Sequence, residues 1–280
     1  MLQIRPLTAK DFGAIIRLTN KERWGFGVRD LKRMLSLEPK GCLVAILNGV
    51  PIGLTTAVSY GKMLGWIGNV VVDVKHRGAG VGSSLVESAI RHLLHLHVRK
   101  IGLFSYLENK SMYEQLNFRT TGGFARLSIS RRARSPTSGN TEAPFRQILR
   151  LDKEAFGADR RRLLERLLRE FPRSWAWILK GREVSGYSVV KQYQDSSEMG
   201  PSVCKQICLE DLATLFRSSL ALARKWPLEV SIPESNPTGL ETAARVGFRV
   251  ERKGLVMSFA DLGEIAVDPA IVAFGFLDKG

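Results

Sequence analysis

The chain has 280 residues, of which 44% are apolar and 25% charged, and this composition excludes a disordered polypeptide. The length is close to that at which one hydrophobic core gives way to two domains. The net charge of +15 favours an anionic ligand or partner, and residues 1–130 contribute most of it, with 18 Lys/Arg against 8 Asp/Glu.

The cysteines and the apolar segments favour a reducing, cytoplasmic location. Cys42, Cys204 and Cys208 are few and odd in number, which argues against a disulfide framework. The chain contains no apolar run of the ~20 residues that a membrane-spanning helix needs. Its first residues carry no apolar segment typical of a secretory signal. We therefore expect a cytoplasmic protein without a membrane segment.

The first half alternates helices with strands. Residues 9–37 are expected to be mostly helical, and residues 41–60 form a hairpin around Asn48-Gly49, a pair typical of tight turns. A buried strand (66–74), a long helix (82–96) and a further strand (100–106) follow. A short helix (110–116) and a strand pair (118–129) complete this half.

The second half repeats this order. Residues 174–190 again read as strand, glycine turn and strand, and Asn117-Phe118-Arg119 matches Gly247-Phe248-Arg249 at an offset of 130. A constant order of elements and offset indicates a tandem duplication. The Ser-, Thr- and Pro-rich stretch between the halves is typical of a linker. We predict domains at 1–130 and 145–280, joined by a linker at 131–144.

The segment VVVDVKHRGAGVGSSL, residues 70–85, carries the chemistry. A buried strand ends, and three glycines then lead directly into a helix. Glycines let backbone N–H groups turn toward one point and let a ligand approach closely, and the helix N-terminus adds unpaired donors. These features predict a site for a phosphate or diphosphate, with Lys75 and Arg77 as counter-charges.

Two familiar phosphate motifs do not fit this segment. A P-loop requires Gly-Lys-Ser/Thr at its end, whereas Gly82 is followed by Ser83. A dinucleotide-binding fold places its glycines after the first strand, with an acidic residue ~20 positions later, and this chain has neither feature.

The segment resembles the acyl-CoA loop of the GNAT acetyltransferase family, in which a strand ending in V-D-P precedes R/Q-x-x-G-x-G/A and a helix. Here the stretch reads VDVKHRGAGVG (72–82), with Val74 in place of the proline. The opening IRPLTAKDF and the later SMYEQLNF also resemble the family. The resemblance implies an α/β fold of two tandem GNAT-like domains, each a mixed, mostly antiparallel twisted sheet flanked by helices.

The resemblance also implies a coenzyme and a catalytic residue. Acetyl-CoA is expected as co-substrate, without a metal, and Tyr113 matches the tyrosine that assists departure of the thiolate. A phenol is protonated at neutral pH and can act as a general acid. The expected coenzyme-binding residues lie on the strand end and the loop: Val71, Val72, Arg77, Gly78, Ala79, Gly80, Val81, Gly82 and Ser83.

Some positions depart from the family pattern. Asn69 stands where many members carry a glutamate that acts as general base, and an amide cannot accept a proton at neutral pH. Glu22 and Glu108 are alternative bases, and neither is favoured. Asn117 replaces a glycine and Tyr106 replaces an asparagine, which leaves the details of coenzyme contact open.

The second half resembles a degenerate copy of the same domain. Ala243 occupies the tyrosine position, and the segment aligned with the phosphate loop lacks clustered glycines. Glu210 and Asp211 lie near its predicted helix start, where carboxylates would repel a diphosphate. We expect no CoA in this half, and instead a role in walling the acceptor site or stabilising the first domain.

These observations favour an N-acetyltransferase in which a primary amine, of a small molecule or a protein, attacks acetyl-CoA directly. The alternative is a protein that binds or senses acyl-CoA without transfer. A nucleic-acid binder is a third hypothesis that no recognisable motif supports. His92 and His95 are expected to be helix-surface residues, and Trp24 is a candidate wall of the acceptor site. The acceptor and the oligomeric state stay open.

Overall fold

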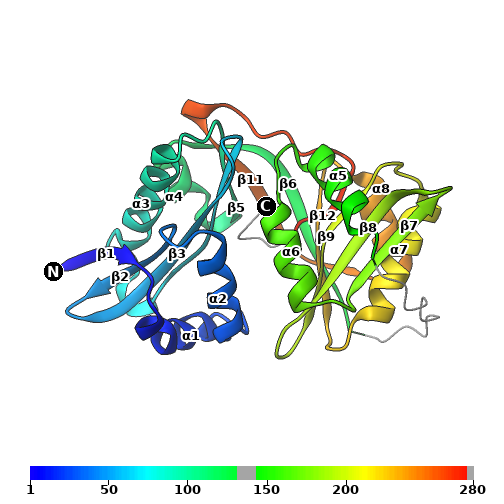
Figure 1. Ribbon diagram of the computed structural model, residues 1–280. Helices are drawn as coiled ribbons and strands as arrows, with labels where there is room; N and C mark the ends of the chain where they lie inside the picture. Colours follow the sequence, from blue (N-terminus) through cyan, green and yellow to red (C-terminus); the bar gives the residue numbers. More distant parts are fainter. Residues whose placement is uncertain (131–142, 276–280) are drawn as a thin grey trace. The chain divides into compact units, whose positions relative to one another are not determined.

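The computed structural model describes residues 1–130 and 143–275, which form two compact units. The N-terminal unit comprises Met1–Thr121 together with Met257–Ile265. The C-terminal unit comprises the described residues of Gly122–Val256 and those from Ala266 onward. Each unit is a mixed sheet with helices against it (Figure 1). Within the described part of the chain, no helix is both long and apolar enough to cross a bilayer.

The sheet of the N-terminal unit has the strand order β1-β2-β3-β4-β5-β11. Its strands are β1 (Leu2–Pro6), β2 (Cys42–Leu47), β3 (Val50–Tyr60), β4 (Leu64–Val72), β5 (Ile101–Tyr106) and the last residues of β11 (Arg249–Phe259). Pairing is antiparallel from β1 to β4 and parallel between β4 and β5. The helices are α1 (Phe12–Lys21), α2 (Val28–Leu37), α3 (Val81–His95) and α4 (Lys110–Gln115), with short 3-10 turns η1 (Ala9–Asp11), η2 (Val74–His76), η3 (Leu107–Asn109) and η4 (Ala260–Leu262).

Helices cover both faces of this sheet. Apolar side chains of α1 and α2, among them Ile15 and Met34, pack on alternate residues of β2 such as Val44. On the opposite face, Gly53 and Gly65 leave room for leucines of α3, because a Cβ at either position would lie within 3 Å of one of those side chains. The two faces thus follow from the period-two alternation of the strands.

The sheet of the C-terminal unit has the order β11-β6-β10-β9-β8-β7, to which β11 (Arg249–Phe259) contributes its residues 249–256, and β12 lies beside β9. Its strands are β6 (Phe118–Ile129, from Gly122 onward), β7 (Trp175–Lys180), β8 (Glu183–Gln192), β9 (Ser197–Cys204), β10 (Leu228–Pro233) and β12 (Ile271–Ala273). The helices are α5 (Phe145–Phe156), α6 (Arg161–Glu170), α7 (Leu209–Leu222) and α8 (Pro237–Val246). Phe216 of α7 and Phe248 after α8 belong to one apolar core with the strands.

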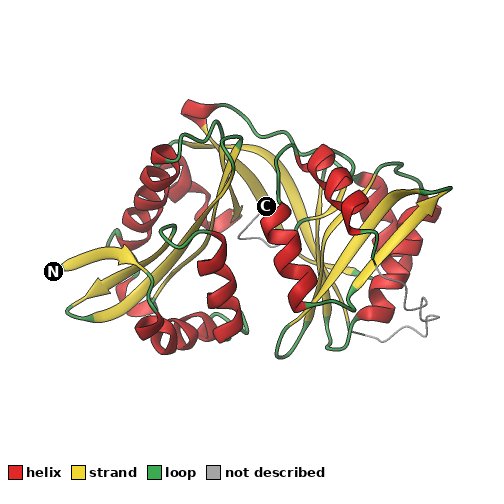
Figure 2. Cartoon of the chain, viewed as in Figure 1, coloured by secondary structure: helices red, strands yellow, loops and turns green. Residues whose placement is uncertain are grey.

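The predicted fold class is confirmed: both units combine helices with mixed, mostly antiparallel sheets (Figure 2). Residues 9–37 are mostly helical, as predicted, and are divided into α1 and α2 at residues 22–27, where Gly25 has a φ of +64°. One local prediction is wrong: the expected strand pair at 118–129 is the single strand β6.

The compact units do not follow the predicted limits along the chain. Residues 122–129 of β6 belong to the C-terminal unit, and residues 257–265 belong to the N-terminal unit. β6 has 12 residues and spans roughly 40 Å, so its first residues can belong to the sheet of one unit and its later residues to the sheet of the other. The domains 1–130 and 145–280 stay a prediction about the repeated sequence, and most of the predicted linker lies outside the described residues.

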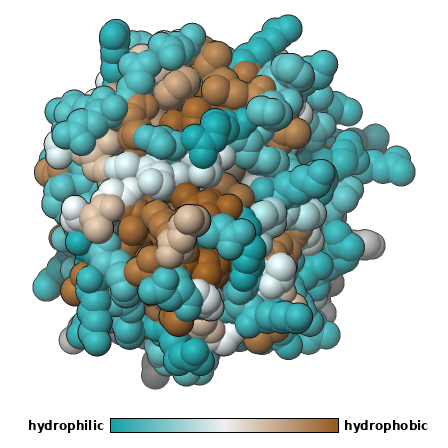
Figure 3. Space-filling view, turned by 90° about the vertical axis from the view of Figure 1, so that its left-hand side faces the viewer, coloured by the Kyte–Doolittle hydropathy of each residue, from teal (hydrophilic) through white to brown (hydrophobic). Residues whose placement is uncertain are grey.

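The surface is not uniformly polar. On the face shown in Figure 3, hydrophilic side chains surround areas of apolar ones. Strand register in the N-terminal unit places Leu2, Leu47 and Val50 directly beside one another, and Leu2 and Val50 are exposed. Part of this unit's surface is therefore apolar despite the high net charge.

Candidate active site

The central feature of the N-terminal unit is the separation of two parallel strands. β4 pairs with β5 over Gly65–Ile67 and Ile101–Leu103. Beyond these residues β4 continues to Val72 with β3 as its only paired neighbour in the part of the chain that the structure describes. The second half of β4 therefore has main-chain donors and acceptors that are not paired with β5.

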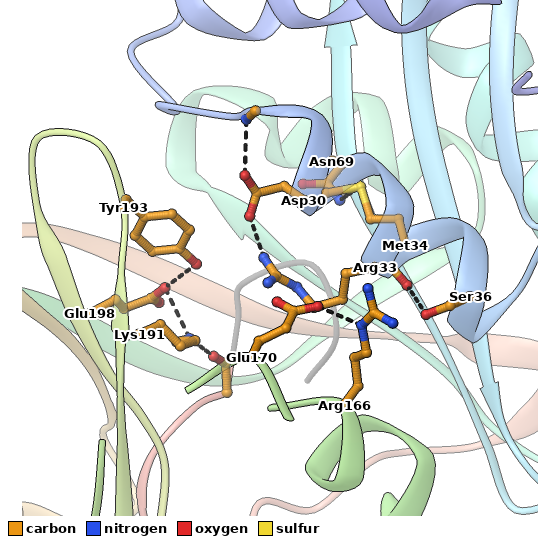
Figure 4. A network of polar contacts seen from close by, with 12 residues as sticks. Asp30, Arg33, Met34, Ser36, Asn69, Arg166, Glu170, Lys191, Tyr193 and Glu198 are labelled. Carbon is orange, nitrogen blue, oxygen red and sulfur yellow. Dashed lines mark hydrogen bonds and ion pairs between the residues drawn. The ribbon is translucent and has the colours of Figure 1, made fainter. Parts of the chain in front are cut away.

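A β-bulge lies where the two strands separate. Gly68 pairs with Thr56, whereas Val71 pairs with Leu54, so that β4 carries one extra residue between them. Asn69 adopts a φ of +52° within this bulge. Its side-chain Nδ2 donates to Thr56 Oγ1 at 3.0 Å and lies 3.6 Å from Met34 Sδ of α2 (Figure 4). The amide is thus held as a donor at the bend of the strand.

The alternation of residues along β4 decides which main-chain groups point away from β3, toward the side that is not paired with β5. Asp73 N donates to Ile52 O of β3 at 2.8 Å, so residues two apart from Asp73, such as Val71, also direct their main chain to β3. Val72 and Val70 then direct theirs away from β3. Of the predicted residues, Val71 thus directs its main chain to β3 and Val72 directs its main chain away from β3; Val70, which the sequence analysis did not name, lies on the same side as Val72.

The loop after β4 is tied down at its first residues. Asp73 caps η2 by accepting from Lys75 N at 3.1 Å, and Lys21 Nζ lies 2.9 Å from Asp73 Oδ2. The hydrogen bond from Lys21 and the Lys75 N–H lower the pKa of Asp73. Arg77 Nε donates back to Val72 O at 3.0 Å. These contacts fix the point from which the glycine-rich segment begins.

The glycine-rich segment itself leaves its donors unused. In the described chain, the N–H groups of residues 78–83 have no hydrogen-bond partner, and the first helical bond runs from Ser84 N to Gly80 O. Gly78 and Gly80 have φ values of +77° and +75°, and a Cβ at either would meet nothing within 4 Å. Gly82 is more enclosed, because a Cβ there would lie 3.5 Å from Met112 Sδ.

These properties fit a diphosphate. Unpaired N–H groups at the start of a helix of 15 residues carry partial positive charge, and open space above two glycines lets an anion approach them. The predicted residues Arg77, Gly78, Ala79, Gly80, Val81, Gly82 and Ser83 are consecutive in this turn. They follow, after η2, the half of β4 that is not paired with β5 and that ends at Val72.

Tyr113 lies on α4 in an aromatic cluster. Its ring is 6% exposed and meets Phe118 edge to face with centroids 6.1 Å apart, and Phe118 in turn contacts Phe259 at 5.5 Å. Burial raises the pKa of the phenol above its ordinary value of 10. The described residues provide no hydrogen-bond partner for the hydroxyl. The phenol is therefore a protonated donor across the physiological pH range.

The alternative bases have different surroundings. Glu22, just after α1, accepts a hydrogen bond from Arg77 at 2.5 Å, so its carboxylate is engaged by a guanidinium. Glu108 is exposed in η3. Asn117 adopts a φ of +64°, and its Nδ2 donates to Asp261 Oδ1 at 2.8 Å, which anchors η4 within the unit.

The remaining sequence candidates occupy ordinary positions. His92 Nε2 lies 3.5 Å from Glu38 Oε1, and His95 Nδ1 contacts the Arg91 carbonyl at 3.0 Å. Trp24 packs against Phe26 with centroids 5.4 Å apart. Within the described residues, no three His, Cys, Asp or Glu side chains are grouped so that they could hold a metal ion.

The corresponding region of the C-terminal unit is chemically different. Ala243 is fully buried in α8 and offers no hydroxyl. The helix after β9 is α7, and its first turn carries Glu210 and Asp211. Lys180 Nζ pairs with Asp211 Oδ2 at 2.7 Å. A helix start with two carboxylates disfavours a bound anion.

Comparisons with known proteins agree with this geometry. The model of the acetyltransferase (GNAT) family matches residues 9–118, and that of an acetyltransferase (GNAT) domain matches residues 148–263. An uncharacterized N-acetyltransferase, YitH, of Bacillus subtilis is 22% identical over 253 residues, covering 88% of this chain and 87% of its own. The holothin acyltransferase of a Pseudoalteromonas species is 23% identical, covering 70% of this chain and 67% of its own.

A solved structure shares the fold of the whole chain. The crystal structure of a putative acetyltransferase from Pyrococcus horikoshii has a TM-score of 0.83 at 20% identity and covers 100% of this chain and 96% of its own. The two family matches together span most of the sequence. The chain belongs to the GNAT family of acyltransferases and contains two such domains.

Proposed function

We propose that the chain is an N-acetyltransferase that uses acetyl-CoA and a primary amine, with its active site in the N-terminal unit. One observation carries this proposal: the half of β4 that is not paired with β5 leads through η2 into a segment whose N–H groups from residue 78 to residue 83 are unpaired. An elongated ligand with a diphosphate at one end and amide groups along its length matches that surface. In the C-terminal unit, the helix that follows β9 instead carries Glu210 and Asp211 in its first turn.

The chain's residues divide the binding task by their chemistry. The turn from Gly78 to Ser83 supplies main-chain donors for the diphosphate. Val70 supplies main-chain groups on the open side of β4 for an extended arm, in the manner of an added strand, and Val72 supplies its N–H, because the Val72 carbonyl already accepts from Arg77 Nε. Acetyl-CoA, when bound, supplies an activated thioester carbonyl to which the amine nitrogen adds and from which the thiolate departs.

Proton transfer is divided between Tyr113 and the solvent. The Tyr113 hydroxyl donates its proton to the departing sulfur, because burial keeps the phenol protonated. The attacking nitrogen loses one proton to solvent as the amide forms, and the phenoxide regains a proton from solvent. N–H groups near the bulge stabilise the negative charge that develops on the carbonyl oxygen. Asn69 cannot accept the proton of the amine, and Glu22 is engaged by Arg77. The proposal therefore assigns deprotonation of the amine to solvent before binding, and the exposed Glu108 of η3 is the carboxylate candidate that remains.

Binding and turnover are measured separately to test this proposal. Calorimetry with acetyl-CoA is expected to give one site per chain. A thiol-release assay over a panel of small amines and peptides then identifies acceptors, and the product mass must rise by one acetyl group. The relative named a holothin acyltransferase makes holothin a sensible member of the first panel. A chain that binds no acyl-CoA contradicts the proposal.

The second candidate function is an acyl-CoA-binding or sensing protein without transfer. It is favoured by the amide at Asn69, where a catalytic carboxylate would stand. Binding of acetyl-CoA without thiol release for any acceptor supports this alternative. Release of thiol together with an acetylated amine rejects it.

A further inference from the structure

The C-terminal unit repeats the strand separation of the N-terminal unit. β9 pairs in parallel with β10 over Ser197–Met199 and Leu228–Val230, three pairs, as β4 does with β5. The pairing of β9 with β8 then shifts between Val190–Met199 and Ser188–Ser202, which marks a bulge. β9 and β10 therefore diverge after a bulge, as β4 and β5 do.

The gap between β9 and β10 is filled by the chain itself. In β12, Ile271 and Ala273 pair antiparallel with Val203 and Ser202 of β9. Cys204 N donates to Ala270 O at 2.9 Å. Residues 270–275, the inserted segment, thus lie along β9 where the coenzyme arm is proposed to lie along β4.

The inserted segment is also bonded to the other side of the gap. Phe274 N donates to Ser231 O at 3.0 Å, the residue after the last parallel pair of β10. The buried Asn236 donates from Nδ2 to Ile271 O at 3.2 Å. Main-chain groups of the segment are therefore satisfied from both walls, which is the pattern of strand addition.

The fit of the segment is close. Residues 271–274 are between 0% and 6% exposed, and the Phe274 ring meets Phe124 edge to face at 6.1 Å. At Gly200, in the bulge, a Cβ would lie 2.0 Å from Phe274 O. Only a glycine at this position allows the two main chains to approach so closely.

A buried charge pair holds the end of the segment. Lys191 of β8 is fully buried and donates to Gly275 O, and its Nζ lies 3.0 Å from Glu198 Oε2 of β9. Tyr193 OH donates to the same Glu198 oxygen at 3.1 Å (Figure 4). The carboxylate of Glu198 offsets the cost of burying the Lys191 ammonium. The same ammonium donates a hydrogen bond to the Gly275 carbonyl at the end of the inserted segment.

We propose that the gap between β9 and β10 is a binding groove for an extended polypeptide, which residues 270–275 occupy in cis and which excludes a coenzyme. Hydrogen bonds to both walls, dry packing and a glycine placed for main-chain contact define a peptide as the ligand. The carboxylates of Glu210 and Asp211 at the start of α7 disfavour a diphosphate there. In the C-terminal unit, the gap that corresponds to the proposed coenzyme site is thus occupied by residues 270–275 of the same chain.

A cut made after folding tests this groove without requiring a truncated chain to fold. A protease site is inserted after the exposed Ala266, and the folded protein is cleaved. The C-terminal fragment is expected to co-elute with the body in size-exclusion chromatography and to exchange with a fluorescent peptide of residues 267–275. The uncut chain is expected to bind the peptide at least tenfold more weakly than the cut chain.

A matched peptide and a coenzyme competition complete the test. The peptide with Phe274→Pro lacks both the N–H donated to Ser231 O and the ring that packs against Phe124, and it is expected to bind at least tenfold more weakly than the native peptide. Loss of the fragment on cleavage without rebinding overturns the proposal, as does displacement of the labelled peptide by acetyl-CoA. These readouts are independent of acetyl transfer, so they stand or fall separately from the proposed function.

Discussion

Arg77 donates from Nε to the main-chain carbonyl of Val72, five residues earlier, at 3.0 Å. The same guanidinium also donates to Glu22, with its Nη2 2.5 Å from Glu22 Oε1. The arginine thus joins the end of α1 to the end of β4 and holds the turn that begins at Gly78. The sequence predicts Arg77 as a counter-charge for the diphosphate. The structure adds contacts through which Arg77 positions the glycine-rich segment.

The pairing of Glu22 with Arg77 predicts that Glu22 is not the general base. Glu22→Gln is expected to lower kcat less than threefold, since the amide still accepts a hydrogen bond from the guanidinium. The free energy of unfolding should change by about 1 kcal/mol or less, because both partners are partly exposed. Steady-state kinetics and urea unfolding check both values. A hundredfold loss of kcat would instead assign the base to Glu22.

Tyr113→Phe removes the proposed proton donor and keeps the ring. The edge-to-face contact with Phe118 survives, so the thermal midpoint should move little. We expect kcat to fall roughly 10²-fold and the Kd for acetyl-CoA to stay within threefold of the original, since general acid assistance contributes 10²–10⁴. Phe118→Leu is the control: it loosens the same cluster but leaves the hydroxyl, and should lower stability more than kcat.

Gly80 and Gly49 form a matched pair for testing the turn. Both have a left-handed φ, +75° and +81°, and a Cβ at either meets nothing within 4 Å. Alanine at each position should cost a similar ~1–2 kcal/mol of stability. Only Gly80→Ala places a methyl group where the diphosphate is proposed to approach, so only this variant should weaken acetyl-CoA binding, by tenfold or more. Equal affinities for both variants would remove the turn from the site.

Local signals in the sequence were sufficient for much of the architecture. Asn48-Gly49 is the turn between β2 and β3, and the glycines at 78 and 80 adopt the left-handed φ that the loop prediction required. The repeated order of elements in the two halves is confirmed by two GNAT domains. Such features depend on residues close in sequence, which is why a single sequence reveals them.

Long-range features could not be inferred in the same way. The exchange of β6 and β11 residues between the units is not marked by a break in either strand, because each stays one continuous strand across the exchange. The insertion of residues 270–275 beside β9 involves partners about 70 residues apart. The choice between Val70 and Val71 on the open side of β4 depends on a bulge whose position only the register shows.

Asp11 predicts an acid-sensitive contribution to stability. It accepts hydrogen bonds from both Arg5 guanidinium NH2 groups at 2.8 Å and from Thr8 N at 2.8 Å, and chiefly the Arg5 contact lowers its pKa to about 2. A carboxylate with a depressed folded-state pKa stabilises above its unfolded pKa of about 4 and loses this contribution as pH falls toward 2.

The measurement compares the original chain with Asp11→Asn in urea at several pH values. The difference in unfolding free energy should be about 1 kcal/mol at pH 6, discounted because Arg5 is one-third exposed, and should shrink between pH 4 and pH 2. A difference that stays constant across this range would show that the charge of Asp11 does not matter.

The environment of Asn69 predicts the pH dependence of transfer. Asn69 at the bulge cannot act as a base and Glu22 is engaged by Arg77, so the proposal assigns deprotonation of the amine to solvent rather than to the exposed Glu108 of η3. The fraction of deprotonated amine then controls kcat/KM, which should rise tenfold per pH unit and level off at the pKa of the acceptor itself. Because burial raises the pKa of Tyr113, no descending limb is expected below pH 10.

Two acceptors of different basicity distinguish deprotonation of the amine by solvent from deprotonation by a side chain of the enzyme. An α-amine with a pKa of about 8 and an ε-amine with a pKa of about 10.4 should give plateaus about 2 pH units apart. An enzyme group acting as base would instead give one inflection at the same pH for both, as in profiles set by the free enzyme. A shared inflection between pH 6 and 7 would therefore contradict solvent deprotonation and require a titrating side chain near the bulge of β4.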